Sequence, residues 1–351
     1  MTIDILKVVV PSVLTFFLGI LITPFFTYYF YKYKMWKRSA RTGSNITTLD
    51  FAKVHNTSAE LSTPRIGGVI IWVSVLLCIA LIYSLSIIFP SDLTEKLNFL
   101  SRGQTLIPIA TLIFASLIGL FDDLLQIFGR GVYSQDPLIY RKIKIACIVL
   151  IGLLISFWFF GKLQHTAIHI PFGGELELGI WFIPFFVLVM LATFSTSVID
   201  GMDGLSGGIL TTIFTAYSVI AFVHNQIDIS ALCAVLAGGT LAFLWFNVPP
   251  ARFYMGETGM LGLTATLSVI AFLTNSVLLL PIIALPLVAT SLSVIIQQIS
   301  YKYFGKRRVF KVAPLHHHFE AIGWSKEKVV MRYWIISVVS AILGVIIAFV
   351  S

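Results

Sequence analysis

Five acidic residues attract attention because of where they lie relative to the apolar segments of this 351-residue chain. Asp122, Asp123, Asp200, Asp203 and Glu257 lie at, or within a few residues of, one end of an apolar segment. Ionisable side chains at membrane depth are costly, so their retention indicates a function. The five belong to three separate loops. If the apolar segments form a bundle, these carboxylates line one anionic cavity.

The pair Asp122 and Asp123 is the first candidate for metal chemistry. Adjacent carboxylates repel each other unless a cation neutralises them. Magnesium prefers oxygen ligands and phosphate-bearing substrates, so a bound Mg²⁺ ion accounts for the pair economically. The alternative, which is common for an isolated Asp-Asp pair, is a solvated start of a loop.

The segment DGMDGLSGG at 200–208 combines two carboxylates with four glycines. Asp200 and Asp203 share one face if the segment is helical. The glycines allow a ligand to approach the backbone closely, and the N-terminus of a following helix suits an anion. The alternative is a glycine-rich turn with two solvated aspartates.

The segment NVPPARFYMGETG at 247–259 has a similar composition. Asn247 supplies an amide, Arg252 a cation, and Glu257 a carboxylate between two glycines. Tyr254 is a candidate for stacking on a nucleotide base. Its alternative role is that of an aromatic anchor at the membrane interface.

Three consecutive histidines, His316, His317 and His318, follow Pro314 in a basic loop. Successive side chains of a helix point about 100° apart, so the three cannot all bind one metal and zinc is not expected. Imidazoles can donate hydrogen bonds to a phosphate or a catalytic group near neutral pH. A structural role is the alternative.

Cationic residues complete the set. Arg65, in TPRIGG at 63–68, suits a phosphate, although a topological anchor explains it equally well. Membrane topology also accounts for most of the role of Arg141, Lys142 and Lys144. Carboxylates for a divalent cation, cations for phosphate and glycines for close approach are together what phosphoryl transfer requires.

The elements that must position these residues are membrane helices. The chain is 58% hydrophobic and 11% charged, whereas soluble domains carry roughly 25% charged residues. Ten apolar runs suit the roughly 30 Å core of a bilayer. We therefore predict an all-α polytopic membrane bundle of about ten transmembrane helices, in a single domain covering 1–351. The runs cover about 5–30, 67–90, 105–121, 143–161, 179–199, 205–223, 229–247, 259–275, 276–300 and 331–350.

The distribution of positive charge sets the orientation of these spans. With the N-terminus outside, 20 of the 24 Lys and Arg residues lie in inner loops and 4 lie outside, as the positive-inside rule requires. Both termini are then on the outer side, and every motif above faces the cytoplasm. The net charge of +8 is explained in this way, so no nucleic-acid partner is expected. The segment 169–178 predicts a small external hairpin.

In this order and on one face of ten spans, the motifs resemble those of the polyprenyl-phosphate N-acetylhexosamine-1-phosphate transferases, over nearly the whole chain. The most specific piece, PLHHHFEAIGWSKEKVVMRYWIIS at 314–337, is similar to the branch that uses UDP-N-acetylmuramoyl-pentapeptide. The resemblance implies transfer to undecaprenyl phosphate, with formation of lipid I and release of UMP in peptidoglycan synthesis. It also implies Mg²⁺, the inner cell membrane with a cytoplasmic active site, and often a homodimer.

The resemblance implies roles for individual residues as well. Asp122, Asp123 and Glu257 are expected to be catalytic and to bind the metal, and His316, His317 and His318 to be catalytic. Both a direct attack by the lipid phosphate and a covalent aspartyl-phosphate route remain open. Contacts with substrate are expected from Arg65, Lys142, Ser197, Asp200, Asp203, Asn247 and Tyr254.

Four positions depart from the family pattern. Glu257 replaces an aspartate, Gln126 stands where a lysine is common, Ser197 where asparagine is usual, and Arg65 where this branch usually has threonine. TPRIGG is more similar to the sister branch, which transfers N-acetylglucosamine phosphate. That reaction, an inactive scaffold and a transporter are the alternatives. A transporter predicts charges near the middle of the bilayer, whereas these acids lie at one face.

Overall fold

The structure is a computed structural model that describes residues 1–36, 61–101, 103–129 and 137–351, with backbone only for 137–140. The segment between the predicted runs 5–30 and 67–90 therefore lies partly outside the described residues, as does the segment between the runs 105–121 and 143–161. The described elements are α1 (Thr2–Lys32), α4 (Gly68–Ile88), α5 (Asp92–Leu97), α6 (Leu106–Phe128), α7 (Pro137–Lys162), β1 (Ala167–Ile170), β2 (Gly174–Glu177), η2 (Gly179–Trp181), α8 (Phe182–Ser195), η3 (Thr196–Ile199), α9 (Leu205–Val223), α10 (Ile227–Asn247), α11 (Gly256–Leu273), η4 (Val277–Leu279), α12 (Leu280–Ile283), α13 (Leu285–Tyr303), α14 (Leu315–Ala321) and α15 (Lys326–Val350).

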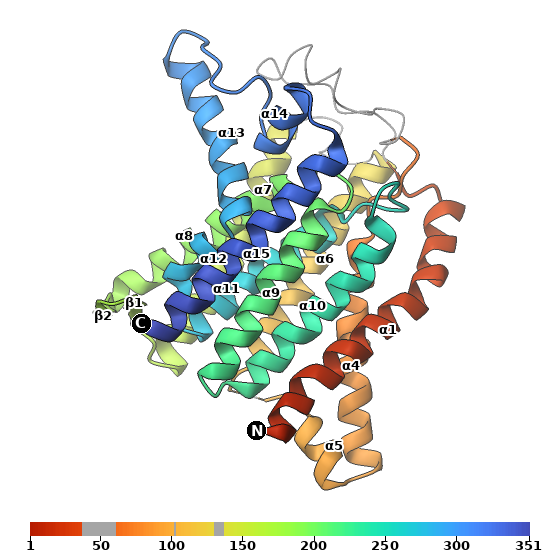
Figure 1. The fold of residues 1–351 in the computed structure, drawn as a ribbon, viewed down its shortest axis with the longest axis vertical. Helices are drawn as coiled ribbons and strands as arrows, with labels where there is room; N and C mark the ends of the chain where they lie inside the picture. The colour runs from red at the N-terminus through yellow and green to blue at the C-terminus, as the bar shows by residue number, and fades with distance from the viewer. Residues whose placement is uncertain (37–60, 102, 130–136) are drawn as a thin grey trace.

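Nine helices in the described residues are long and apolar enough to cross a membrane, and a bent pair of helices can supply a tenth span (Figure 1). The prediction of an all-α polytopic membrane protein is confirmed. The expected division of 259–300 is confirmed as well, because α11 ends at Leu273 and Thr274 follows as its C-cap.

The apolar run predicted at 276–300 is not one continuous helix. Val277–Ile283 and Leu285–Tyr303 meet at an angle of 83°. Pro286 stands in the first turn of α13, where its missing N–H costs nothing, whereas inside a continuous helix it would remove a hydrogen bond. The chain therefore turns at Ala284, and α13 leaves the bundle at its upper end in Figure 1.

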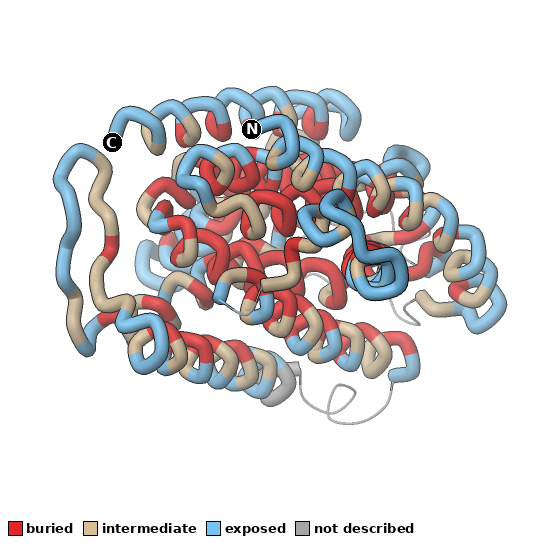
Figure 2. The backbone as a smooth tube through the Cα atoms, turned by 90° about the horizontal axis from the view of Figure 1, so that it is seen from below, coloured by how far each residue is buried: buried red, intermediate tan, exposed pale blue. Residues whose placement is uncertain are grey.

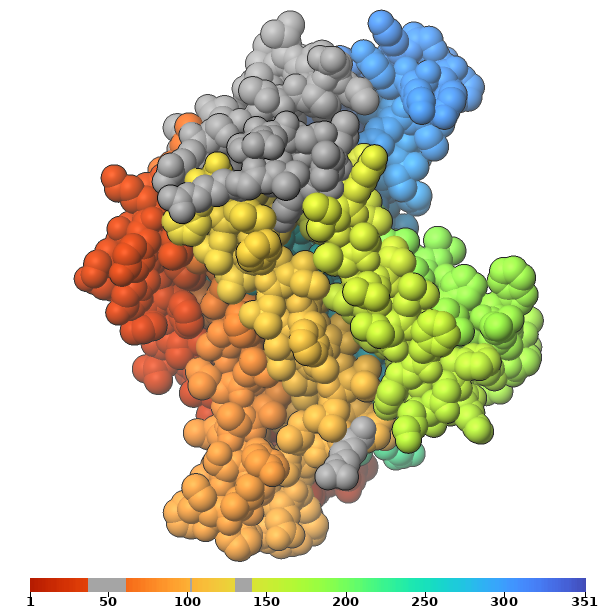
Figure 3. Space-filling view, turned by 180° about the vertical axis from the view of Figure 1, so that it is seen from behind, coloured from red at the N-terminus to blue at the C-terminus, as the bar shows by residue number. Residues whose placement is uncertain are grey.

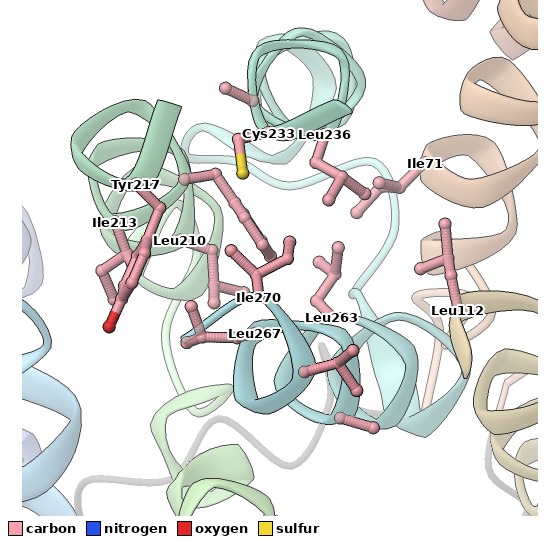
Figure 4. Packing of buried hydrophobic residues seen from close by; sticks show 14 of the residues in the cluster. Ile71, Leu112, Leu210, Ile213, Tyr217, Cys233, Leu236, Leu263, Leu267 and Ile270 are labelled. Carbon is pink, nitrogen blue, oxygen red and sulfur yellow. The ribbon is translucent and has the colours of Figure 1, made fainter. Parts of the chain in front are cut away.

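Helix α11 is the centre of the bundle, and 89% of its most apolar window is buried. Its side chains Leu263, Leu267 and Ile270 pack against residues of α9 and α10 such as Leu210 and Leu236 (Figure 4). Close packing of membrane helices depends on small residues at the contact. In α11 these are glycines, which face α4 and α6.

The outer helices carry the lipid-facing surface. In α1 and α7 only 17% and 22% of the apolar window is buried, and Figure 2 shows exposed residues on the outside of the bundle around a buried interior. Large apolar side chains such as Phe17, Leu21 and Phe157 are exposed there. Such a surface suits hydrocarbon rather than water, so the chain is a multi-pass membrane protein.

A hairpin lies at the opposite end of the bundle from α14. Strands β1 and β2 pair antiparallel with Ile170 opposite Gly174, which confirms the predicted turn. Both chain termini also lie away from α14 (Figure 1). One end of the bundle is therefore left to the loops that carry the motifs.

Candidate active site

All the motif loops meet at the end of the bundle that lies uppermost in Figure 1. Helices α6 and α10 end there, while α4, α9, α11 and α15 begin there. The expectation that carboxylates from separate loops converge on one face is therefore met by the fold. The short helix α14, which carries the histidines, covers the same end.

A cavity of about 250 Å³ joins the motifs. Residues from every motif segment line the cavity except the Asp122–Asp123 pair, which is not part of its lining. Charged, polar and apolar groups all contribute to its lining. The cavity is lined by Arg65, Ser197, Val198, Asp200, Gly201, Gly256, Glu257, Met260, Pro314, His316 and His317.

A lysine links the carboxylates of two helices. Lys144 Nζ donates to Asp122 Oδ2 at 2.9 Å and to Glu257 Oε1 at 2.8 Å. Asp122 and Asp123 are each 1% exposed, and the Glu257 side chain is 21% exposed. Lys144 reaches them from α7, which runs beside α6 on the rear face of the molecule (Figure 3). Lys144 was not predicted to be a site residue, because membrane topology alone explains a lysine at the inner end of a span.

Two aspartates cap the first turn of α11. Asp123 Oδ2 accepts a hydrogen bond from the Thr258 N–H at 2.9 Å, and Asp200 Oδ2 accepts one from the Gly256 N–H at 3.1 Å. The first N–H groups of a helix have no partner within it, and negative charge near them is stabilising. Gly256 has φ = +70°, a conformation that favours glycine. These contacts fix Glu257, the next residue, relative to Asp122 and Asp123.

Three carboxylate oxygens in this cluster are buried without a hydrogen-bond partner among the described residues: Asp122 Oδ1, Asp123 Oδ1 and Glu257 Oε2. Unpaired oxygens of this kind are suitable ligands for a hard divalent cation. Nevertheless, the described part of the chain contains no three acidic, histidine or cysteine side chains arranged around one metal position. Lys144 lies between Asp122 and Glu257, so metal binding by this set stays a prediction.

Asn247 and Asp203 hold the glycine-rich loops together. Asn247 Oδ1 accepts from the Gly204 N–H at 2.9 Å, and its Nδ2 donates to the Phe253 carbonyl at 2.9 Å. Asp203 Oδ2 accepts from the Ala251 N–H at 3.1 Å. Asn247 is 2% exposed, so its geometry supports a positioning role, and its contact with substrate stays a prediction.

Backbone hydrogen bonds of Tyr254 join the TPRIGG segment at 63–68 to the segment at 247–259. Its backbone N–H donates to the Pro64 carbonyl at 2.8 Å, and its carbonyl accepts from the Gly67 N–H at 2.9 Å. The half-buried phenol has a raised pKa because burial and the nearby Asp203 carboxylate disfavour its anion. Its hydroxyl hydrogen-bonds Thr63, and stacking on a base stays a prediction.

The histidines divide as their helical spacing predicts. His316 and His317 line the cavity, whereas His318 Nδ1 accepts from the Lys311 N–H at 3.2 Å and its ring packs on Phe310. The structure therefore gives His318 a structural contact in α14 and leaves its predicted catalytic role untested. His317 Nδ1 lies 3.1 Å from Glu320 Oε2.

His316 is fully buried, and neither ring nitrogen has a hydrogen-bond partner among the described residues. Burial, reinforced by neighbouring His317, holds its pKa well below the usual value. A neutral imidazole has one donor and one acceptor nitrogen. Its Nε2 faces Gly201 across the cavity wall, so His316 has an unused donor or acceptor at the site.

Two other residues are not brought into the carboxylate cluster. Lys142 is exposed, and two positions along a helix correspond to a rotation of about 200°, so it points away from the side of α7 that bears Lys144. Substrate binding by Lys142 stays a prediction. Gln126 supplies no cation to the paired aspartates, and Lys144 supplies one from another helix.

At one end of this membrane bundle lie buried carboxylates, an arginine and one imidazole, His316, that has no partner among the described residues. This arrangement is typical of a membrane-embedded transferase that acts on phosphate. The family model of glycosyl transferase family 4 matches residues 105–275, from the start of α6 to beyond α11. The chain belongs to the family of phospho-N-acetylmuramoyl-pentapeptide transferases. The predicted resemblance is thereby confirmed.

Curated relatives of that name match over most of the chain. The protein from Chloroflexus aurantiacus is 34% identical over 300 residues, which cover 82% of this chain and 78% of the relative. The Bacillus mycoides protein is 37% identical, with 81% and 83% covered. The protein from Caldanaerobacter subterraneus is 32% identical, with 95% and 96% covered. The chain is an enzyme of a family that uses a nucleotide-sugar donor, a membrane lipid acceptor and a divalent metal ion.

Proposed function

We propose that this enzyme transfers phospho-N-acetylmuramoyl-pentapeptide from its UDP-linked precursor to undecaprenyl phosphate, giving lipid I and UMP. The observation that carries the proposal is the cavity in which Arg65, Glu257 and His316 meet beside two buried aspartates. The names of the relatives support the choice of donor. We propose a cytoplasmic active site at the inner membrane, since 20 of 24 positive residues are assigned to that side; a homodimer stays a prediction.

The unpaired oxygens of Asp122, Asp123 and Glu257 fit a divalent ion, and we propose Mg²⁺ held by these residues. Magnesium there would neutralise charge on the donor diphosphate. Arg65 lines the same cavity and has the planar guanidinium that suits phosphate oxygens. Its position also places it in favourable electrostatic interaction with the Asp123 carboxylate.

The acceptor needs little activation by a base. A phosphate monoester has a second pKa near 6, so it is mostly a dianion at pH 7. One of its oxygens attacks the β-phosphorus of the donor, forming a new P–O bond, while the bond from that phosphorus to the bridging oxygen breaks and UMP leaves with the electron pair. Asp122 or Asp123 would position, or finally deprotonate, the acceptor phosphate, and neutral His316 is suited to donate a hydrogen bond to phosphate. A covalent aspartyl-phosphate is the alternative route.

The sister reaction with UDP-N-acetylglucosamine is the second candidate. Its support is Arg65 within TPRIGG, and the structure fixes this segment against Tyr254 beside the cavity. Supplying purified enzyme with each UDP-sugar in turn, with undecaprenyl phosphate, separates the two. Release of UMP only with the N-acetylglucosamine donor would contradict the muramoyl assignment.

The assignment of the carboxylates is tested with Asp123→Asn and Glu257→Gln. Each should reduce Mg²⁺-dependent UMP release by about 100-fold or more, because positioned charges at a reacting phosphate contribute on this scale. Asp92→Asn is the matched control, since Asp92 is 80% exposed in α5, away from the site. All variants should elute as folded protein in size-exclusion chromatography. Full activity in both site variants would sink the assignment.

A further inference from the structure

Lys144 lies where a cation that bridges Asp122 and Glu257 would lie. Its ammonium contacts one oxygen of each carboxylate, at 2.9 and 2.8 Å, and its side chain is only 13% exposed. The partner oxygens, Asp122 Oδ1 and Glu257 Oε2, remain buried and unpaired among the described residues. The ammonium thus pairs with the two carboxylates without saturating them.

We propose that Lys144 is a resident cation that competes with the divalent ion for this site and withdraws when the ion binds. This inference rests on the metal site of the proposed function. Magnesium requires ligand oxygens at about 2.0–2.1 Å, so an ion bridging the same two carboxylates would lie within a few ångströms of the ammonium. Two like charges at that separation in a buried site repel strongly.

The charges at the bridge itself support the exchange. Asp122 and Glu257 carry two negative charges when ionised, and the single charge of Lys144 offsets one of them. A divalent ion in place of the ammonium would offset both, and buried charges require such pairing.

An aromatic ring also lies within reach of the ammonium. In the bridging position, Lys144 Nζ lies 5.9 Å from the centre of the Phe194 ring on α8. A lysine ammonium gains stabilisation over an aromatic face at this range, and the four-carbon side chain is flexible. The Phe194 ring is therefore available to the ammonium if it leaves the two carboxylates.

This exchange has a consequence for the order of binding. A divalent ion must displace an internal cation before it occupies the site, so its affinity for the substrate-free protein is reduced by the cost of that displacement. A diphosphate that supplies extra ligands and negative charge offsets the cost. Metal and nucleotide are then expected to bind more tightly together than either does alone.

The test measures Mn²⁺ binding to the purified full-length protein in detergent, without nucleotide or lipid, from the electron paramagnetic resonance signal of free Mn²⁺. Lys144→Met should bind Mn²⁺ at least about 10-fold more tightly than the unchanged protein. Lys144→Gln, which retains hydrogen-bonding capacity, provides a second variant if the methionine variant does not fold. Lys144→Arg keeps the charge and should bind no more tightly than the unchanged protein.

Lys142→Met is the matched control, because it removes the same charge from an exposed position two residues away on α7. It should leave the affinity unchanged, which separates local competition from a general effect of charge. Glu257→Gln should weaken binding and thereby shows that Mn²⁺ occupies the carboxylate site.

The outcomes distinguish this inference from the proposed function. Unchanged or weaker binding in both Lys144→Met and Lys144→Gln, with weaker binding in Glu257→Gln, overturns the competition while leaving the metal site standing. Equal tightening by Lys142→Met also overturns it. If no protein binds Mn²⁺ specifically, both the competition and the proposed metal site fail.

Discussion

At the scale of single residues, the two oxygens of one carboxylate have different tasks in this site. Asp123 Oδ2 accepts the Thr258 N–H, whereas Asp123 Oδ1 has no partner among the described residues. One oxygen holds α11 and the other is free for a ligand. An asparagine can still accept the backbone hydrogen bond with its amide oxygen. Asp123→Asn is therefore expected to remove charge with little loss of local structure.

His316 gives a prediction for stability against pH. Its folded pKa lies well below the usual value, while the unfolded chain protonates it below about pH 6.5. From that pH downward the unfolded state binds the extra proton, so stability is lost as pH falls, by at most about 1.4 kcal/mol per unit. His316→Gln removes this contribution, and its apparent Tm should fall less between pH 7 and 5.5 than that of the unchanged protein.

The measurement is detergent-solubilised thermal unfolding at each pH. The titratable and charged groups that line the same cavity, Arg65, Asp200, Glu257 and His317, are present in both proteins, so the comparison isolates the change at His316. Equal acid sensitivity with and without His316 would show that this imidazole is protonated in the folded state.

The sequence predicted which residues belong to the site better than it predicted which atoms they contact. The carboxylates and histidines were predicted because they are adjacent to one another in the sequence or lie at the ends of apolar segments. Lys144 was not, because only the rotation of α7 about its axis decides whether Lys142 or Lys144 faces Asp122, and the apolar pattern of a lipid-facing helix fixes that rotation weakly. The backbone contacts of Asn247 were not predicted either, because its partner Gly204 is distant in sequence and its partner Phe253 lies in a loop.

At the scale of elements, the site depends on how closely α6 approaches the first turn of α11. A side chain on Gly119 would collide with the backbone of Glu257 and Thr258. This contact involves backbone, which cannot move aside as a flexible side chain can. The separation between Asp122 on α6 and Glu257 on α11 is therefore set by the absence of a single methyl group.

Gly119→Ala is expected to reduce UMP release by about 10-fold or more, since small displacements of catalytic groups cost rate on this scale. It should also lower the apparent Tm through overpacking. Gly161→Ala is the control within α7, where nothing lies within 4 Å of the added carbon; there the substitution should be neutral or stabilising by up to about 1 kcal/mol. UMP release by Gly119→Ala equal to that of Gly161→Ala would contradict the tight contact.

Hydropathy predicted the existence and approximate ends of the helices, because membrane thickness imposes their length. It did not predict the 83° bend before α13. Prolines such as Pro11 and Pro24 lie inside continuous α1, so a proline in an apolar run does not by itself determine a break. The bend depends on what neighbouring helices can pack against, which only the assembled bundle decides.

At the scale of the whole molecule, the orientation of the bundle can be tested from both ends. Phe172 lies at the hairpin and Lys306 follows α13; both are exposed. In a background with Cys78, Cys147 and Cys233 replaced by alanine, Phe172→Cys should react with a membrane-impermeant maleimide in intact cells. Lys306→Cys should react only after permeabilisation. The reverse pattern would invert the predicted topology and place the cavity outside.

The central position of α11 has a practical consequence for finding ligands. Its first turn forms part of the cavity, while its remaining length is buried among the other helices. A compound that binds the native cavity and not the unfolded chain stabilises the folded protein by mass action. Here the compound would contact α11, the helix around which the other helices pack. Melting of the solubilised enzyme is therefore expected to report nucleotide analogues directly, so that libraries can be screened without handling the insoluble acceptor.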